Sequence, residues 1–269
     1  MRLYVERVYK MHRQNALHIG KLMVAGLVLL VIMALSACAT KPDPVDVGLA
    51  ETDQFLLQSL PSQTLSYAES VRPVLQRRCV VCHGCYDAPC QLKLSSPEGI
   101  RRGANKEKLY NGSRFSTASP TRLFIDAKTT EQWRGKGFHA VLNEGEQAPV
   151  ANLEQSVMYK MLRLKQINPQ ARVGILPASF DLSLDRPQTC PTLEEFDEYA
   201  EKFPRQGMPF GLPNLDDDEY RVLVQWLAQG APMPDVAQPS AQVAAQIGRW
   251  ETFLNGTSNK QRLVSRYLY

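Results

Sequence analysis

Residues Cys79–His83, with the sequence Cys-Val-Val-Cys-His, have the most specific chemistry in this chain. A Cys-x-x-Cys-His run is the attachment motif of c-type haem. Its two thiols, one helical turn apart, form thioethers with the porphyrin, and the histidine that follows binds the iron as proximal ligand. The motif therefore predicts covalently bound haem c, with Cys79 and Cys82 as attachment residues and His83 as an iron ligand.

Two other kinds of site use similar spacing. A structural zinc site needs a second cysteine or histidine pair, and a thioredoxin-like redox pair needs a βαβ setting. Neither context accompanies Cys79 and Cys82. Haem attachment is the favoured interpretation, and a structural metal or a disulfide is the alternative.

A second iron ligand is predicted in the loop at residues 206–213, where Pro and Gly residues surround Met208. The acidic run 216–219 after this loop suits the first turn of a helix. Helically spaced apolar residues then continue to Leu227. A methionine in the loop before such a helix is where a c-type cytochrome presents its sixth ligand. Met208 is the candidate distal ligand. The alternatives are Met208 packed on the haem edge, His139 as ligand, or an open or water-bound position.

The first 38 residues predict export. Basic residues precede an apolar run over residues 22–37, which is short for a membrane span of ~20 residues. Leu35-Ser36-Ala37-Cys38 has the form of a lipoprotein cleavage site, with Cys38 as the lipidated residue, and an uncleaved anchor is the alternative. Both interpretations place the chain in the periplasm, where haem is attached to such motifs.

Six cysteines are present, of which Cys85, Cys90 and Cys190 have no role in the leader or the haem motif. An oxidising compartment favours a disulfide among these three. Cys85 and Cys90 are close enough in sequence to pair locally, and Cys190 paired with either would connect distant segments. A metal site on Cys85 and Cys90 is a further alternative, and the sequence leaves the pairing open.

Domain organisation follows from composition. The leader (1–38) is followed by the Pro-rich, polar residues 39–65, which predict a linker. Residues 66–235 predict a mainly α, cytochrome c-like haem domain with a long mixed insertion. Residues 236–269 predict a further helical region, which ends without a cap, so we expect a truncated chain.

Local patterns predict several individual elements. Ser66-x-x-Glu69 predicts a helix start before the motif, and Pro73 a kink or restart within that helix. Residues 121–126 favour a strand, residues 153–165 an amphipathic helix, and Thr192-x-x-Glu195 the start of another helix.

The chain carries a net charge of +4 but lacks a Lys/Arg tract with interleaved aromatic residues, so nucleic-acid binding is not expected. Its clearest basic stretch contains Arg101, Arg102, Lys106 and Lys108. Such a stretch is usually a solvated face, and contact with anionic lipid head groups is its functional alternative.

From about Tyr67 to Tyr269 the chain resembles the N-terminal part of bacterial fatty acid cis/trans isomerases, which are longer proteins. The resemblance rests on Arg78-Cys-Val-Val-Cys-His-Gly-Cys-Tyr-Asp-Ala-Pro-Cys, Tyr110-Asn-Gly-x-Arg, Pro120-Thr-Arg-Leu-Phe-x-Asp-Ala and Val141-Leu-Asn-Glu. It implies a periplasmic, haem c-dependent enzyme that converts cis double bonds of membrane acyl chains to trans.

The predicted function is therefore an isomerase that acts on unsaturated phospholipid acyl chains or free fatty acids at the membrane surface. A membrane-tethered electron-transfer cytochrome is the main alternative, and a haem-based sensor with an open sixth position is a third. The sequence identifies neither catalytic residues nor a surface that binds the acyl chain.

Overall fold

The computed structural model describes residues 45–85, 88–110, 117–177, 188–234 and 239–268, with positions 23, 26, 180, 181 and 183 in addition. The chain divides into two units, Met1–Pro44 and Val45–Tyr269, and almost all described residues belong to the second. The leader expected at residues 1–38, including Cys38, lies outside the described residues apart from Met23 and Gly26. No helix in the described ranges has the length and apolar character needed to cross a bilayer.

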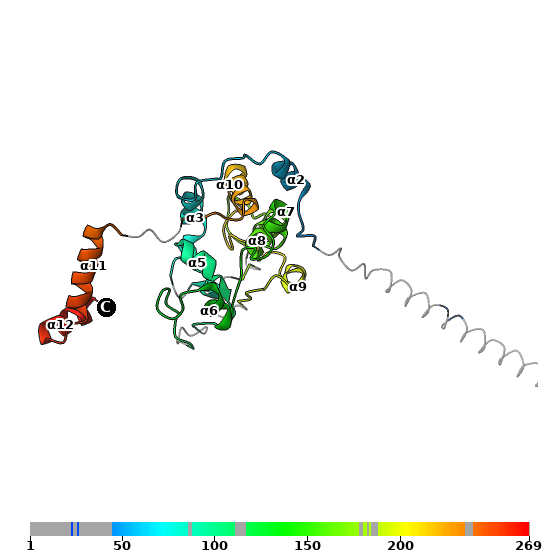
Figure 1. Cartoon of the computed structure of the whole chain (residues 1–269). Coiled ribbons are helices and arrows are strands. Elements are labelled where there is room, and N and C mark those ends of the chain that lie inside the picture. Colours follow the sequence, from blue (N-terminus) through cyan, green and yellow to red (C-terminus); the bar gives the residue numbers. More distant parts are fainter. Residues whose placement is uncertain are drawn as a thin grey trace, which may run out of the picture. The chain divides into compact units, whose positions relative to one another are not determined.

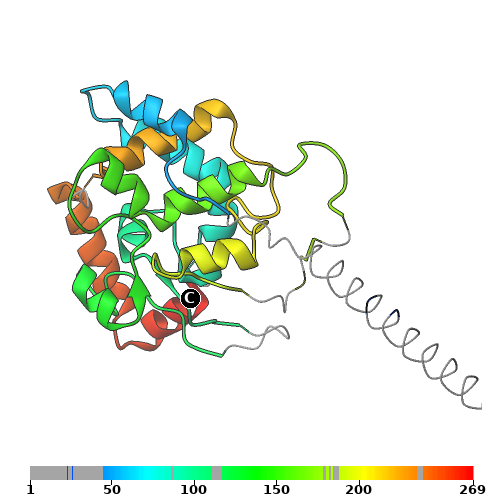
Figure 2. The same cartoon turned by 90° about the vertical axis from the view of Figure 1, so that its right-hand side faces the viewer.

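The described structure is mainly helical, as the sequence predicts (Figures 1 and 2). Its helices are α2 (Glu51–Gln58), the π-helical turn η1 (Tyr67–Val71), α3 (Arg72–Arg78), α4 (Val80–His83), the 3-10 turn η2 (Pro89–Gln91), α5 (Pro97–Arg102), α6 (Thr130–Gly135), α7 (Pro149–Glu154), α8 (Val157–Ile167), α9 (Phe196–Lys202), α10 (Asp217–Ala228), α11 (Ala241–Leu254) and α12 (Asn259–Leu268). Two short strands, β1 (Ala104–Asn105) and β2 (Phe138–His139), pair antiparallel with Ala104 opposite His139.

Helix α10 lies at the centre of the core and contacts α2, η1, α7 and α8. Trp226 on this helix is fully buried, its ring packs 6.1 Å from that of Tyr67, and its Nε1 donates to the carbonyl of Pro232 at 3.0 Å. Asp216 and Glu219 form a capping box at its start. The predicted helix after the Met208 loop is therefore confirmed, and its apolar stripe belongs to the core.

The helix before the haem motif does not restart at Pro73: the π-helical turn η1 runs directly into α3, and Val71 and Arg72 at the junction both have right-handed helical backbone angles. The Ser66 hydroxyl accepts a hydrogen bond from the Glu69 backbone N–H at 3.3 Å, which starts η1. Pro73 then lies in the first turn of α3. The Arg72 N–H donates to the Tyr67 carbonyl five residues back, so a π-helical turn directly precedes Pro73, and this local change of register accommodates a residue without an N–H.

The linker predicted at residues 39–65 contains a helix, because α2 (Glu51–Gln58) packs on the core beside α10 (Figures 1 and 2). Val47 is buried, and Asp53 is 1% exposed. The Asp53 carboxylate accepts hydrogen bonds from the hydroxyls of Tyr159 at 2.6 Å and Tyr220 at 2.9 Å. A polar segment is thus anchored by one buried acidic side chain, a contact that apolar periodicity does not reveal.

The strand predicted at residues 121–126 is a turn. The Asp126 carboxylate accepts hydrogen bonds from the Arg122 backbone N–H at 2.7 Å and from its guanidinium at 2.9 Å. Phe124 has a φ of 68°, which no strand residue adopts. Side-chain-to-backbone bonding has overridden the β-propensity of the segment.

Two predicted helices have different boundaries from those expected. The helix expected over residues 153–165 is divided into α7 and α8, because the Ser156 hydroxyl accepts from the Tyr159 N–H and starts a new helix. The helix expected from Thr192 begins at Phe196, after a turn in which the Thr192 N–H donates to the Glu195 carboxylate.

The basic stretch is not a uniform solvated face. Arg102 is completely buried, and its guanidinium lies over the rings of Trp133 and Phe138 at 5.5 and 4.8 Å. Arg101 donates to the carbonyls of Met233 and Pro234. Arg102 is therefore a core residue and is excluded from contact with lipid head groups.

We expect Asp53→Ala to lower the free energy of unfolding by about 2–4 kcal/mol, because the buried hydroxyls of Tyr159 and Tyr220 lose their acceptor. Urea denaturation followed by circular dichroism measures the change. Gln54→Ala, at an exposed position of the same helix, is the control and should leave the midpoint almost unchanged. Equal midpoints for Asp53→Ala and the unmodified chain would show that this carboxylate does not anchor α2.

Candidate functional site

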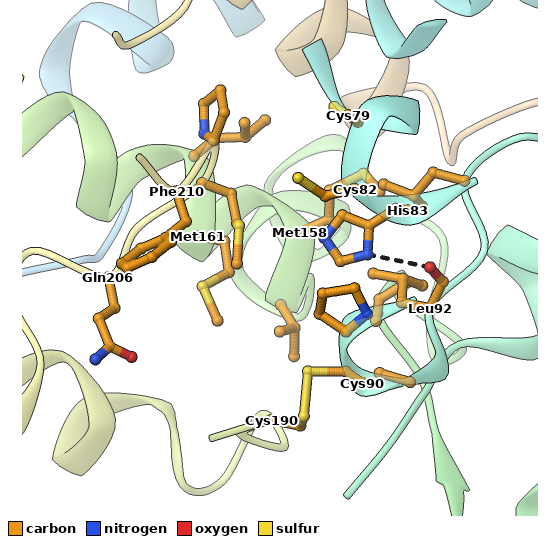
Figure 3. A pocket seen from close by; sticks show the side chains of 18 of the residues that line it. Cys79, Cys82, His83, Cys90, Leu92, Met158, Met161, Cys190, Gln206 and Phe210 are labelled. Carbon is orange, nitrogen blue, oxygen red and sulfur yellow. Dashed lines mark hydrogen bonds between the residues drawn. A yellow bond between two sulfur atoms is a disulfide. The ribbon is translucent and has the colours of Figure 1, made fainter. Parts of the chain in front are cut away.

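An apolar cavity of about 160 Å³ brings the predicted site residues together. Cys79, Cys82 and His83 line it, and Met208 lines it as well. Figure 3 shows Cys82 and His83 on one side, with Met161 and Phe210 across from them. The motif and the methionine loop, more than a hundred residues apart in the sequence, therefore contribute to one site.

The geometry of the motif follows from a change of helix direction at Cys79. Helix α3 ends at Arg78, and the short helix α4 starts at Val80. The backbone N–H groups of Cys82 and His83 both donate to the Cys79 carbonyl, at 3.1 and 2.9 Å. This turn places both thiols and the imidazole on the cavity wall.

A hydrogen bond to a backbone carbonyl fixes the tautomer of His83. His83 is 8% exposed, and its Nδ1 lies 3.1 Å from the carbonyl oxygen of Leu92 (Figure 3). Since a carbonyl only accepts, Nδ1 carries the proton. Burial lowers the pKa of His83, against the opposing effect of the bond to Leu92. The neutral ring therefore keeps the lone pair of Nε2 for a ligand.

The cysteine pairing that the sequence left open is Cys90–Cys190, with the two residues 100 positions apart. This disulfide forms part of the cavity wall (Figure 3). Cys79, Cys82 and Cys85 are free thiols. Burial raises the pKa of Cys79 to about 12, with the Glu219 carboxylate adding to the effect, so this thiol is protonated at neutral pH.

Helix α8 holds the Met208 loop in place. The Met208 backbone N–H donates to the Met161 carbonyl at 3.0 Å. Gly207 packs so closely on the backbone of Lys165 that a Cβ atom there would clash with it. Helix α8 also contributes the side chains of Met158 and Met161 to the cavity, so three methionines line it.

His139 lines the same cavity from strand β2. Its pKa is lowered, first by burial and then by the positive charge of Lys106, while a hydrogen bond with the Pro191 backbone opposes the shift. His139 is thus a neutral imidazole on the cavity wall, and the structure keeps it among the alternatives to Met208.

An ion-pair cluster joins the motif to the helix that follows the methionine loop. Glu219, in the first turn of α10, is 6% exposed. It accepts from Arg78 Nε at 2.7 Å and from Arg77 Nη2 at 3.3 Å. Because Arg78 directly precedes Cys79, this cluster fixes the start of the motif relative to α10.

Sequence reasoning missed part of the cavity. Met158 and Met161 lie within the segment predicted as an amphipathic helix, and Phe210 lies in the predicted Met208 loop, but the sequence assigns none of the three to the site. The signal was present in the loop sequence Met-Pro-Phe-Gly-Leu-Pro, because Met208, Pro209, Phe210 and Leu212 all line the cavity. The approach of α8 to this loop is a tertiary contact that no local pattern records.

The fold and the site define a mainly helical protein in which a Cys-x-x-Cys-His turn faces an apolar, methionine-rich cavity. Both thiols of this turn are free. A family model for fatty acid cis/trans isomerase matches residues 118–269, more than half of the chain. The chain therefore belongs to the fatty acid cis/trans isomerase family. The matched range contains Met161, Cys190 and Met208, while the Cys-x-x-Cys-His motif precedes it. Comparison with the curated proteins and with the solved structures gives no match.

We expect Cys190→Ser to lower the free energy of unfolding by about 3–5 kcal/mol, because the disulfide closes a loop of 100 residues in the unfolded chain. Denaturant titration without reductant measures the loss, and peptide mapping of unreduced protein should recover the Cys90–Cys190 pair.

Cys85→Ser is the matched control for this experiment, because Cys85 is an exposed free thiol. It should leave both the stability and the cystine peptide unchanged. A cystine between Cys85 and Cys90 in the peptide map would contradict the pairing.

Proposed function

We propose that this chain is a periplasmic haem c isomerase that converts cis double bonds of membrane unsaturated fatty acids to trans. Membership of the fatty acid cis/trans isomerase family gives the reaction class. The observation that carries the haem is that Cys79, Cys82 and His83 line one cavity, with His83 Nδ1 bonded to the Leu92 carbonyl.

The residues present fit a covalently attached haem in three respects. Cys79 and Cys82 are free thiols one turn apart, as thioether formation requires. The bond from His83 to Leu92 is the outer-shell contact that fixes the tautomer and the ring plane of a ligating histidine. The cavity wall is mostly apolar, which suits the body of a porphyrin. In this proposal residues 66–235 form a cytochrome c-like haem domain.

The apolar wall also suits the reaction. A carbon–carbon double bond offers no hydrogen-bonding group, and its rotation requires no proton transfer. Leu92, Val141 and Leu223 on the cavity wall exclude water without binding a polar intermediate. When bound, haem supplies an iron that can withdraw π-electron density and return it without net redox change.

Met208 is the proposed distal ligand. Its loop is fixed to α8 through the Met161 carbonyl, and the loop and His83 line the same cavity. Met158, Met161 and His139 are the other cavity residues with a suitable donor atom. Met158 and Met161 lie on the regular helix α8, whereas Met208 lies in a loop.

The cysteine chemistry supports the proposed periplasmic location. A disulfide such as Cys90–Cys190 persists in oxidising compartments, and haem attachment to a Cys-x-x-Cys-His motif is expected there too. We propose export through a leader at residues 1–38 with lipidation at Cys38.

Cys82→Ala tests the proposed function. We expect the exported protein to lose covalent porphyrin, because the attachment motif needs both of its thiols and only Cys79 remains, and cells that express it to stop producing trans fatty acids. Mass spectrometry of the purified chain and gas chromatography of membrane fatty acids after solvent shock measure the two effects. Cys85→Ala is the matched control and should keep both properties. An unchanged trans fraction in cells whose Cys82→Ala protein carries no porphyrin by mass spectrometry would refute the role of haem.

Met208→Leu tests the distal ligand by absorption spectroscopy. It conserves side-chain volume but removes the thioether, so the oxidised protein should lose its weak long-wavelength methionine–iron band. Met161→Leu, in the same cavity, is the matched control and should keep the band. Loss of the band in Met161→Leu and its retention in Met208→Leu would assign ligation to α8 instead.

A further inference from the structure

Helices α11 and α12 form a hairpin, residues 241–268 (Figure 1). Large apolar side chains on this hairpin are exposed. On α11 these residues recur at helical spacing on one face, and on α12 they lie in the second half and at the middle of the helix. Their exposed fractions are 45% for Val243, 44% for Ile247, 60% for Trp250, 71% for Leu263, 89% for Tyr267 and 61% for Leu268. No residue of either helix is buried.

The hairpin is nevertheless an ordered unit. The Ser240 hydroxyl accepts from the Val243 N–H and caps the start of α11. The Ser265 hydroxyl on α12 lies 2.6 Å from the Leu254 carbonyl at the end of α11 and donates to it. Leu254 and Val264 are half-buried between the helices. The exposed side chains are therefore carried on a defined surface.

Positive charge borders this apolar surface. Between residues 241 and 268 the sequence has four basic residues, Arg249, Lys260, Arg262 and Arg266, and one acidic residue, Glu251, which gives a net charge of 4 − 1 = +3. Arg262 and Arg266 are four residues apart, as are Leu263 and Tyr267, so on α12 a cationic row runs beside an apolar row.

We infer that the hairpin binds the surface of a bilayer that contains anionic phospholipids. Amphipathic helices with Lys and Arg on the polar face and large apolar residues on the other lie in the plane of the membrane interface. Trp250 and Tyr267 are of the types enriched at that depth. Each basic residue near an anionic surface contributes to binding. The inference rests on the proposed function, since it names the lipid surface from which the enzyme takes its substrate.

Charge distinguishes the bilayer from a second copy of the chain. Two hairpins that met through their apolar faces would bring together two sets of cations, each with a net charge of +3. An anionic lipid surface instead places opposite charges next to each other. Complementarity of charge and of apolar character therefore favours lipid.

Tryptophan fluorescence of the full chain tests the inference directly. Of its three tryptophans, Trp133 is 5% exposed, Trp226 is 0% exposed and Trp250 is 60% exposed, so only Trp250 is exposed enough to report on a surface contact. Vesicles of equal parts saturated phosphatidylglycerol and phosphatidylcholine should shift its emission to the blue and sediment the protein. Vesicles of phosphatidylcholine alone should bind at least about tenfold more weakly.

Two pairs of charge-reversal substitutions test whether binding to the anionic vesicles depends on the hairpin. Arg262→Glu with Arg266→Glu should weaken binding to the anionic vesicles by at least about tenfold, because four units of charge change at the surface. Lys128→Glu with Lys136→Glu makes the same change at exposed positions outside the hairpin and should retain most of the binding. Equal losses for both pairs, or no binding by the unmodified chain, would overturn the inference. So would a dimer in sedimentation with Trp250 already blue-shifted without lipid.

The vesicle-binding test can fail or succeed independently of the test of the proposed function. Saturated acyl chains contain no double bond, so binding to these vesicles requires neither isomerisation nor haem. Cys82→Ala should therefore bind vesicles like the unmodified chain. Failure of vesicle binding would remove the docking surface and leave the cavity and its proposed chemistry unaffected.

Discussion

The Cys90–Cys190 disulfide is the constraint on which the described cavity depends. It joins the segment just after the Cys-x-x-Cys-His turn to a segment 100 residues later, and both line the cavity. A loop of that length has a large closure entropy when it is unlinked. Once it is closed, helix α8 and the Met208 loop need only short-range contacts, such as the bond from Met208 N–H to the Met161 carbonyl, to complete the wall.

Within that wall, the Leu92 carbonyl determines what His83 can do. A buried imidazole without a partner would leave two polar nitrogen atoms unsatisfied, at a cost of about 1–3 kcal/mol for each group. The bond to Leu92 satisfies one nitrogen and leaves the other without a hydrogen. The Leu94 N–H donates to the His83 carbonyl at 2.7 Å and holds the same segment against the motif. One short loop therefore fixes the backbone, the tautomer and the ring orientation of the predicted ligand.

The sequence predicts well what depends on neighbouring residues. The Ser66 cap and the capping box of α10 are local, and the structure contains both of them. Three features escaped prediction because they depend on distant partners: the anchoring of α2 by Asp53, the burial of Arg102 between Trp133 and Phe138, and the pairing of Cys90 with Cys190. The predicted members of the site lie together in the cavity, whereas Met158 and Met161 could be assigned to it only from the packing of α8.

The substrate class imposes a physical problem that the cavity alone does not solve. Each methylene group moved from hydrocarbon into water costs about 0.8 kcal/mol, so exposing about ten of them costs about 8 kcal/mol. An acyl chain must therefore pass from the bilayer to an apolar site with little exposure to water. For a protein that binds its substrate from solution, this cost makes the equilibrium concentration of dissolved, monomeric fatty acid very low. A protein held at the interface by an amphipathic hairpin takes the chain where it is already in hydrocarbon, and the free energy of lipid binding then offsets part of the cost of extraction.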